Sequence, residues 1–211
     1  MIPTEKEMND ALEERVGKEN LQKLKSSTVA VLGLGGLGSN VSVSLARAGV
    51  GKLILADFDK VDITNLNRQQ YKASQLGIPK TEAIFENLKE IAPYLEIKTY
   101  EERITEENIE RICKDADIIC EAFDNPEAKA MLVNHVLENM PDKYLVAASG
   151  MAGFDSTNLI KTRKLSSKFF ICGDGISDVN DGIGLVSSRV MACAAHEAHM
   201  IVRIIIGEDN E

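Results

Sequence analysis

The sequence predicts an α/β protein with a Rossmann-like, doubly wound and mostly parallel sheet. Short apolar runs alternate with longer segments of helical spacing along most of the chain, and strict alternation favours βαβ units with parallel strands. A glycine-rich turn follows the first apolar run directly, as in sheets that bind a ligand at the carboxyl ends of their strands. The 211 residues suffice for one domain, which we expect over residues 26–211, preceded by an N-terminal helical arm over residues 1–25.

The elements can be assigned in order along the chain. Apolar residues recur at helical spacing between residues 5 and 24, and Gly17 divides this arm into two short helices. Strands are then expected at residues 28–32, 52–56, 96–100, 116–121 and 144–149. Helices are expected between them at residues 38–48, 80–91, 105–114 and 126–139.

The alternation ends after Gly150. Residues 157–163 and 168–171 have the composition of short strands and no helix between them, so we expect them to extend the sheet in antiparallel orientation. Residues 173–184 are rich in Gly and Asp and indicate a mobile loop. Residues 185–206 predict a closing helix with apolar residues on more than one face.

Composition restricts the compartment and the partners. Hydrophobic residues make up 44% and charged residues 27%, and no apolar run reaches the roughly 20 residues that span a bilayer. Residues 1–25 are rich in Glu and Lys and lack the apolar centre of a secretion signal, so we expect a cytoplasmic protein. The net charge of −9 argues against broad binding to nucleic acid or membranes and favours small ligands or proteins as partners.

Cysteine usage argues against a structural metal. The four cysteines are Cys113, Cys120, Cys172 and Cys193, and they form no C-x-x-C pair. We therefore expect no zinc site built from thiolates. Reduced thiols are the expectation for a cytosolic protein.

The glycine-rich turn has the spacing of a dinucleotide-binding fingerprint. Its glycines are Gly33, Gly35, Gly36 and Gly38. Glycine permits a tight turn and a close approach of the backbone to phosphate, and the N-terminus of the following helix attracts anions. Asp57 ends the second apolar run, nineteen residues after Gly38, where a carboxylate would accept hydrogen bonds from ribose hydroxyls. This spacing alone suits NAD equally well.

A long connection over residues 58–79 carries further polar candidates. It contains Asn65, Arg68 and Gln69, and Lys80 begins the helix that follows. Long connections in compact domains are often functional. The planar guanidinium of Arg68 and the compact ammonium of Lys80 suit the negative charge of a triphosphate and of its pyrophosphate leaving group. A solvated surface charge is the alternative for either residue taken alone.

One acidic residue is placed to bind a metal. Asp124 follows the expected strand at residues 116–121, on the carboxyl edge of the sheet. A carboxylate beside a triphosphate would most naturally hold Mg²⁺. Because Pro126 comes next, Asp124 and Asn125 could instead form only the N-cap of a helix.

Together these positions resemble the E1-like activating-enzyme superfamily, specifically its ThiF/MoeB branch of sulfur-carrier adenylyltransferases and, within it, the short ThiF-like proteins. The similarity covers residues 24–207. It is most specific in three strings: DFDKV at residues 57–61, NLNRQ at residues 65–69, and GIPK at residues 77–80.

The resemblance implies roles for individual residues. It implies that Arg68, Lys80 and Asp124 are catalytic, with Asp124 also linked to the metal. Asp57 would bind ribose and Gly36 would lie at the phosphates. The nucleotide-binding set implied in this way is Gly33, Gly35, Gly36, Gly38, Asp57, Asp59, Asn65, Arg68, Gln69, Lys80, Asp124 and Asn125.

The resemblance also implies an activity, with ATP and Mg²⁺ as cofactors. The C-terminal carboxylate of a small ubiquitin-like sulfur carrier, a ThiS-like protein with a Gly-Gly tail, would attack the α-phosphorus of ATP. Acyl-adenylate and pyrophosphate would form, as a step of thiamine biosynthesis. Positioning and charge stabilisation would supply most of the acceleration. Because relatives pair, a homodimer is expected.

The chain departs from the family pattern at three points. It lacks the two C-x-x-C pairs of the zinc-containing members. Residues 173–184 contain no cysteine nucleophile, and Cys172 at their edge is interpreted as structural. Arg15 is the candidate for the N-terminal arginine that relatives extend to the ATP of a partner subunit.

Three alternatives remain at this point. One is an E1-like enzyme that activates a small-molecule or tRNA-bound carboxylate, against which the acidic charge weighs mildly. A second is a NAD-dependent oxidoreductase, although no hydride-transfer constellation of Tyr and Lys or His and Asp is visible. The third is a nucleotide-binding scaffold without catalysis, which the retention of every charged motif position disfavours.

Overall fold

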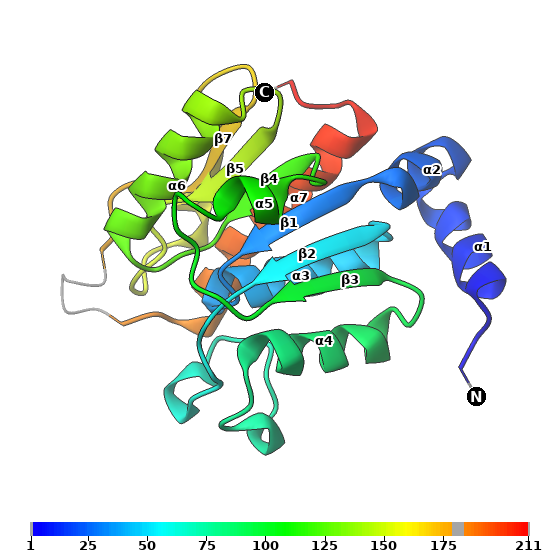
Figure 1. The fold of residues 1–211 in the computed structure, drawn as a ribbon, viewed down its shortest axis with the longest axis horizontal. Coiled ribbons are helices and arrows are strands. Elements are labelled where there is room, and N and C mark those ends of the chain that lie inside the picture. Colours follow the sequence, from blue (N-terminus) through cyan, green and yellow to red (C-terminus); the bar gives the residue numbers. More distant parts are fainter. Residues whose placement is uncertain (1, 179–183, 211) are drawn as a thin grey trace.

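The computed structural model describes residues 2–178 and 184–210. These residues form a seven-stranded sheet in the order β3-β2-β1-β4-β5-β7-β6, with helices on both faces (Figure 1). The strands are β1 (Thr28–Leu32), β2 (Lys52–Ala56), β3 (Glu96–Tyr100), β4 (Ile118–Glu121), β5 (Tyr144–Ala148), β6 (Lys161–Lys164) and β7 (Phe169–Gly173). The helices are α1 (Glu5–Val16), α2 (Lys18–Ser26), α3 (Gly36–Ala48), α4 (Lys80–Ile91), α5 (Ile109–Cys113), α6 (Pro126–Asn139) and α7 (Ser187–Ile206).

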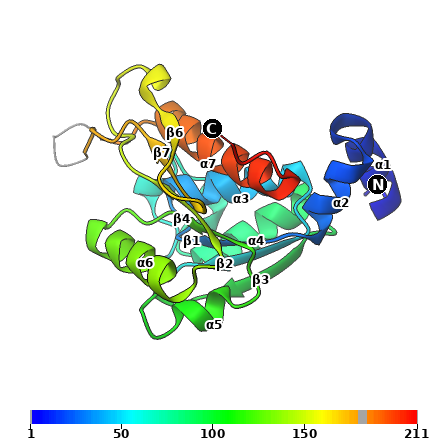
Figure 2. The ribbon, with the colours of Figure 1, turned by 90° about the horizontal axis from the view of Figure 1, so that it is seen from above.

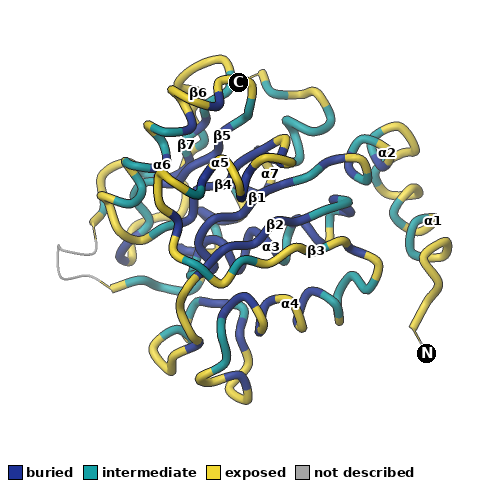
Figure 3. Tube along the Cα trace, in the orientation of Figure 1, coloured by how far each residue is buried: buried dark blue, intermediate teal, exposed yellow. Residues whose placement is uncertain are grey.

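Helices cover both faces of the sheet (Figure 2), and its central strands β1, β2, β4 and β5 are buried except at their first residues in β1, β2 and β5 (Figure 3). In β1, Val29 and Val31 pack into a core shared with α3, α4 and α7. Ala30 and Leu32 point to the opposite face and pack with α5 and α6. This alternation follows from the two-residue period of a strand. The doubly wound α/β fold predicted from the sequence is therefore confirmed.

The N-terminal helices differ in how they meet the body. Helix α1 has no fully buried side chain among the described residues, only Val16 at its end packs partly against the core, and the helix extends away from the sheet (Figure 1). Gly17, with φ +82°, ends α1 and precedes α2, as predicted. Helix α2 buries Leu21 and Leu24, and Lys23 Nζ donates to the carbonyl of Ile206 at 3.1 Å. The arm is thus fastened to the end of α7 through its second helix.

The C-terminal strands correct one part of the sequence prediction. Strand β7 pairs in parallel with β5, and only β6 is antiparallel to its neighbour β7. The chain leaves β5, forms the edge strand β6, and then turns back to form β7 between β5 and β6 (Figure 3). The first part of the expected strand at residues 157–163 is a short 3-10 turn, Thr157–Leu159.

Helix α5 and strand β4 are also shorter than predicted. Helix α5 begins at Ile109 because Asn108 Oδ1 accepts a hydrogen bond from the Thr105 amide at 2.9 Å, which gives the backbone a non-helical alternative. Strand β4 begins at Ile118, since the Asp117 side chain bonds the Thr28 amide at 2.8 Å.

Part of the expected mobile loop lies outside the described residues, namely residues 179–183. Gly173, where that loop was expected to begin, is the last residue of β7. In the part of the chain that the structure describes, no helix combines the length and apolarity needed to cross a membrane.

Candidate functional site

The glycine-rich turn connects β1 to α3 and can be formed only by glycine at two positions. Gly33 has φ +92°, and a Cβ there would lie 2.7 Å from the Ala122 carbonyl oxygen. A Cβ on Gly38 would lie 1.8 Å from the carbonyl oxygen of Gly33. These distances are far below van der Waals contact, so the turn packs directly against its own helix and against the end of β4.

Helix α3 presents the polar groups of its first turn at this site. It begins at Gly36, two residues earlier than predicted, and Gly35 is its N-cap without a side-chain cap from the described residues. The first N–H groups of a helix have no partner within the helix and carry a partial positive charge. The turn therefore offers unpaired donors to an anion.

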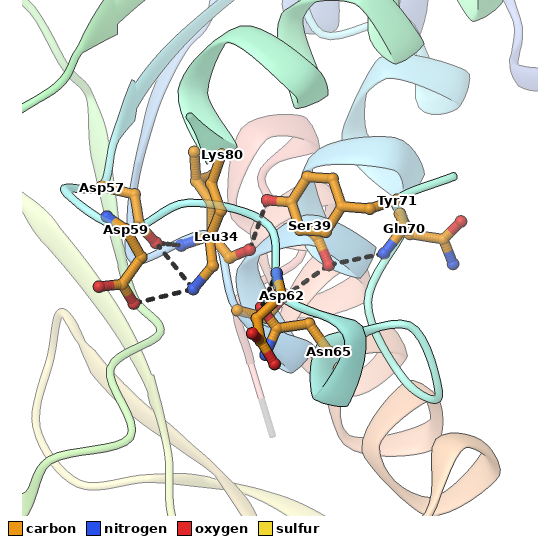
Figure 4. A network of polar contacts seen from close by, with 10 residues as sticks. Leu34, Ser39, Asp57, Asp59, Asp62, Asn65, Gln70, Tyr71 and Lys80 are labelled. Atoms are coloured by element: carbon orange, nitrogen blue, oxygen red, sulfur yellow. Dashed lines mark hydrogen bonds and ion pairs between the residues drawn. The ribbon is translucent and has the colours of Figure 1, made fainter. Parts of the chain in front are cut away.

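Asp57 holds the glycine turn from the end of β2. Its Oδ2 accepts a hydrogen bond from the Leu34 amide at 2.6 Å, and its Oδ1 accepts from the Asp59 amide at 2.8 Å (Figure 4). Burial raises the pKa of Asp57, although the nearby Lys80 ammonium opposes that effect. Each carboxylate oxygen keeps a second lone pair, so Asp57 can still accept from a ligand hydroxyl while it fixes the turn.

Lys80 lies between the two acids of the DFDKV string. Its Nζ is 2.9 Å from Asp59 Oδ2 and 4.0 Å from Asp57 Oδ2 (Figure 4). Its side chain is only 7% exposed, so the alternative of a solvated surface charge is wrong for this residue. The position is fixed further by the Lys80 amide, which donates to the Asp59 carbonyl at 2.9 Å.

Arg68 and Gln69 lie next to the glycine turn. A Cβ built on Gly36 would be 3.5 Å from Arg68 Cδ, and one built on Gly35 would be 3.9 Å from Gln69 Nε2. Arg68 Nη1 donates to the Thr64 carbonyl at 2.9 Å. Arg68 Nε and Gln69 Oε1 are buried and have no hydrogen-bond partner among the described residues. Such unsatisfied groups are rare in native proteins and call for a partner.

The connection after β2 is fastened to α3 by polar residues that sequence reasoning missed. Asn40 Nδ2 donates to the carbonyl of Arg68 at 3.0 Å, and Ser39 Oγ accepts from the Gln70 amide at 3.1 Å. Tyr71 Oη donates to the Leu34 carbonyl at 2.7 Å (Figure 4). Ser and Asn in the first turn of a largely buried helix were the available signal, because buried polar side chains need partners.

Asn65 has a local structural role. Its Oδ1 accepts a hydrogen bond from the Asp62 amide at 3.1 Å and closes the short 3-10 turn Ile63–Asn65 (Figure 4). This turn precedes Arg68, whose amide donates to the carbonyl of Asn65 at 3.1 Å. The interactions that the structure describes for Asn65 therefore orient the segment that carries Arg68.

The structure separates the roles of Asp124 and Asn125. Asn125 Oδ1 accepts from the Ala128 amide at 2.8 Å and caps α6, with Pro126 in the first turn. Asp124 is exposed and makes no hydrogen bond or ion pair with any residue that the structure describes. It follows Ala122, whose carbonyl faces Gly33, so it lies on the carboxyl edge of the sheet next to the glycine turn.

Two other candidate residues, Cys172 and Arg15, are not part of this site. Cys172 is fully buried in β7, and Arg15 is in the last turn of the protruding α1. Over residues 2–178 and 184–210, no group of three or more His, Cys, Asp or Glu side chains is arranged to hold a metal ion.

Comparisons with known proteins agree with this geometry. The sequence matches the ThiF family over residues 9–210. It is 40% identical over 139 residues to the tRNA threonylcarbamoyladenosine dehydratase of Bacillus subtilis, covering 65% of this chain and 54% of the relative. It is also 40% identical over 112 residues to the molybdopterin-synthase adenylyltransferase of Haemophilus influenzae, covering 53% of this chain and 46% of that relative. The matched segments thus span about half of these relatives.

A solved structure shares the fold over nearly its whole length. The E. coli tRNA threonylcarbamoyladenosine dehydratase TcdA, in complex with ATP, superposes with a TM-score of 0.87, 20% identity and coverage of 99% of this chain and 98% of that one. The resemblance inferred from the glycine turn and the three motif strings is therefore confirmed, and the chain belongs to the ThiF family.

Proposed function

We propose that this protein is an ATP-dependent adenylyltransferase that activates a carboxylate as its acyl-adenylate. The observation that carries the proposal is the pair of buried, unpartnered atoms Arg68 Nε and Gln69 Oε1 above the glycine turn. A phosphate chain on the turn would accept a hydrogen bond from Arg68, and a nucleotide or its water shell would donate to Gln69. The relatives named as adenylyltransferases support this assignment.

Each residue would act by binding or orienting ATP. The α3 N-terminus and Gly36 would receive the phosphates, and Asp57 would accept from a ribose hydroxyl while it holds Leu34. Lys80 would exchange part of its contact with Asp59 for phosphate oxygens, and Arg68 would stabilise charge as pyrophosphate leaves. Gly33, Gly35 and Gly38 would shape the turn that receives the phosphates.

Mg²⁺ fits the residues present at the edge of the sheet. Magnesium is commonly held by one or two protein carboxylates together with substrate phosphates, and it keeps several waters. Asp124, with no other described partner, could supply such a carboxylate. The metal would neutralise charge on the phosphates, while Asp124 would fix its position.

We further propose that the substrate carboxylate is the Gly-Gly tail of a small ubiquitin-like sulfur carrier of the ThiS type, in thiamine biosynthesis, with the enzyme acting as a homodimer. The acidic charge of −9 favours a protein partner over RNA. A tRNA-bound carboxylate is the second candidate substrate. The fold of this chain matches that of the E. coli tRNA threonylcarbamoyladenosine dehydratase over 98% of that chain, which supports this candidate. Size measurement by light scattering tests the dimer.

ATP–pyrophosphate exchange separates these candidates. Exchange is measured with Mg²⁺ and either a panel of Gly-Gly carriers or tRNA, with Asp124→Ala as the comparison. Exchange that needs a carrier and collapses in the variant supports the proposal, and exchange that needs tRNA supports the second candidate. Absence of exchange with either, together with tight NAD binding, would instead favour an oxidoreductase.

A further inference from the structure

A buried acid lies directly beneath the turn that carries Asp124. Glu121, the last residue of β4, is fully buried. Its Oε1 accepts a hydrogen bond from the Phe123 amide at 2.7 Å, and its Oε2 is 2.6 Å from Lys129 Nζ on α6. The carboxylate therefore ties together the end of β4, the turn that follows it and α6.

These contacts fix the turn on both sides of Asp124. The Phe123 amide immediately precedes Asp124, and Lys129 lies on the helix that immediately follows the turn. A buried carboxylate without partners would be costly, whereas charge-assisted hydrogen bonds are short and directional. Asp124 itself makes no hydrogen bond or ion pair with described residues that could orient it, so the orientation of its backbone depends on neighbouring groups.

A second buried acid provides a natural comparison. Glu197 on α7 is also fully buried, but its Oε2 has no hydrogen-bond partner among the described residues and its Oε1 is 3.8 Å from Cys120 Sγ. Burial raises the pKa of both acids. Only Glu121 has an ammonium group within hydrogen-bonding distance. Burial and the nearby Glu121 carboxylate both raise the pKa of Glu197, and the hydrogen-bond partner that the structure describes for its side chain is Cys120, not a residue of the β4–α6 turn.

We infer that Glu121, paired with Lys129, is a positioning residue for Asp124 that holds the β4–α6 turn so that the Asp124 carboxylate faces Mg²⁺ and the nucleotide phosphates. This inference rests on the proposed function, because it assigns Asp124 to the metal. It adds two residues that lie outside the nucleotide-binding set. Neither is expected to touch the nucleotide.

The test measures how tightly a fluorescent ATP analogue binds, with and without Mg²⁺ and without any carboxylate substrate. Glu121→Gln keeps an acceptor for the Phe123 amide but loses the ion pair, and Lys129→Met removes the other partner. Each variant is expected to weaken binding in Mg²⁺ about 3- to 10-fold, a loss of one positioned contact, and to leave binding in EDTA unchanged. Glu197→Gln, the control, should bind as wild type does.

A double-mutant cycle separates positioning from a general structural role. In an Asp124→Asn background, Glu121→Gln should have no further effect on Mg²⁺-dependent binding. Equal losses in both backgrounds, or losses that persist in EDTA, would overturn the inference. If urea unfolding shows that Glu121→Gln does not fold, the same cycle is measured with Lys129→Met in place of Glu121→Gln.

The outcomes also distinguish this inference from the proposed function. If Asp124→Asn weakens Mg²⁺-dependent binding and neither Glu121→Gln nor Lys129→Met does, the positioning role is wrong and the function stands. If the protein binds no ATP analogue at all, the proposed function fails first, and the positioning role fails with it.

Discussion

At the scale of single residues, the site depends on a few side chains that perform two tasks. Asp57 illustrates this best, because the carboxylate expected to meet ribose also holds the Leu34 amide in the glycine turn. Lys80 is similar, since the cation expected to meet phosphate also neutralises Asp57 and Asp59. Substituting such a residue should therefore change both ligand binding and stability.

Lys80→Met is predicted to reduce ATP affinity by an order of magnitude or more and to lower the free energy of unfolding by about 1–3 kcal/mol, because it leaves a buried carboxylate without its cation. ATP titration and urea unfolding measure the two effects. Lys60→Met, at an exposed position of the same connection, is the control and should change neither. Unchanged ATP affinity in Lys80→Met would contradict the role assigned to Lys80.

Gly38→Ala is predicted to destabilise the protein by at least about 3 kcal/mol or to prevent folding, since overpacking against backbone cannot be relieved by a rotamer change. The added Cβ would lie 1.8 Å from the Gly33 oxygen. Gly184→Ala, where no atom lies within 4 Å of the added carbon, should unfold at nearly the wild-type urea concentration. Equal stability of the two variants would show that α3 does not pack so closely on the turn.

Asp174 should give a stability contribution that depends on pH. Although burial opposes it, hydrogen bonds from Ser177 and Ile176 and the ion pair with Arg189 lower the pKa of Asp174 from 3.8 to about 2. A carboxyl group with a lowered pKa stabilises the folded state above its unfolded pKa, and this contribution disappears as pH falls through the folded value.

The stability difference between wild type and Asp174→Asn should accordingly be constant from about pH 7 to pH 5 and should shrink below about pH 4. Urea unfolding at several pH values measures it. Asp10→Asn, on the exposed face of α1, should show a difference near zero throughout. A difference for Asp174→Asn that grows on acidification would contradict the assignment.

At the scale of elements, the ends of helices and strands explain most departures from the sequence prediction. The periodic segments at α4 and α6 begin and end as predicted, Lys80–Ile91 and Pro126–Asn139. Helix α5 and strand β4 are shorter because the Asn108 and Asp117 side chains compete for backbone groups. Side-chain capping of this kind is decided by local geometry, which periodicity does not contain.

The cap of α6 gives an element-scale prediction. Asn125→Ala should cost about 1 kcal/mol of stability because the Ala128 amide loses its acceptor, whereas Asn125→Asp should retain most of it. Urea unfolding compares the two variants with wild type. If Asn125 also contacts nucleotide, Asn125→Asp should weaken ATP binding while it preserves stability; equal ATP affinity in all three proteins would limit Asn125 to capping.

At the scale of the whole molecule, the two-layer core encloses every cysteine. All four lie among the described residues and are buried, Cys113 on the α5 face and the other three on the α7 face. Burial raises the pKa of Cys113 to about 12. Enclosed thiols of this kind are poor nucleophiles.

Ellman's reagent should therefore label none of the cysteines in the folded protein and four in guanidinium chloride. The rate of labelling should follow the rate of global unfolding. Rapid stoichiometric labelling of Cys172 under native conditions would instead restore it as a candidate for a covalent link to the carrier. A Cys172→Ser variant identifies the labelled position.

The sequence by itself determined the fold class, the family and the positions of the main motifs. Alternation of apolar runs, glycine spacing and charged strings are local properties, and a local pattern is sufficient where each strand is followed by its helix. The tertiary structure alone decided that β7 enters the sheet parallel to β5, because that placement depends on contacts between distant segments. It also decided which polar groups are buried without partners, as with Arg68 Nε, and that Glu121 accepts a hydrogen bond from the Phe123 amide next to Asp124. Burial and hydrogen bonding depend on the packing of several elements at once, which no spacing along the chain records.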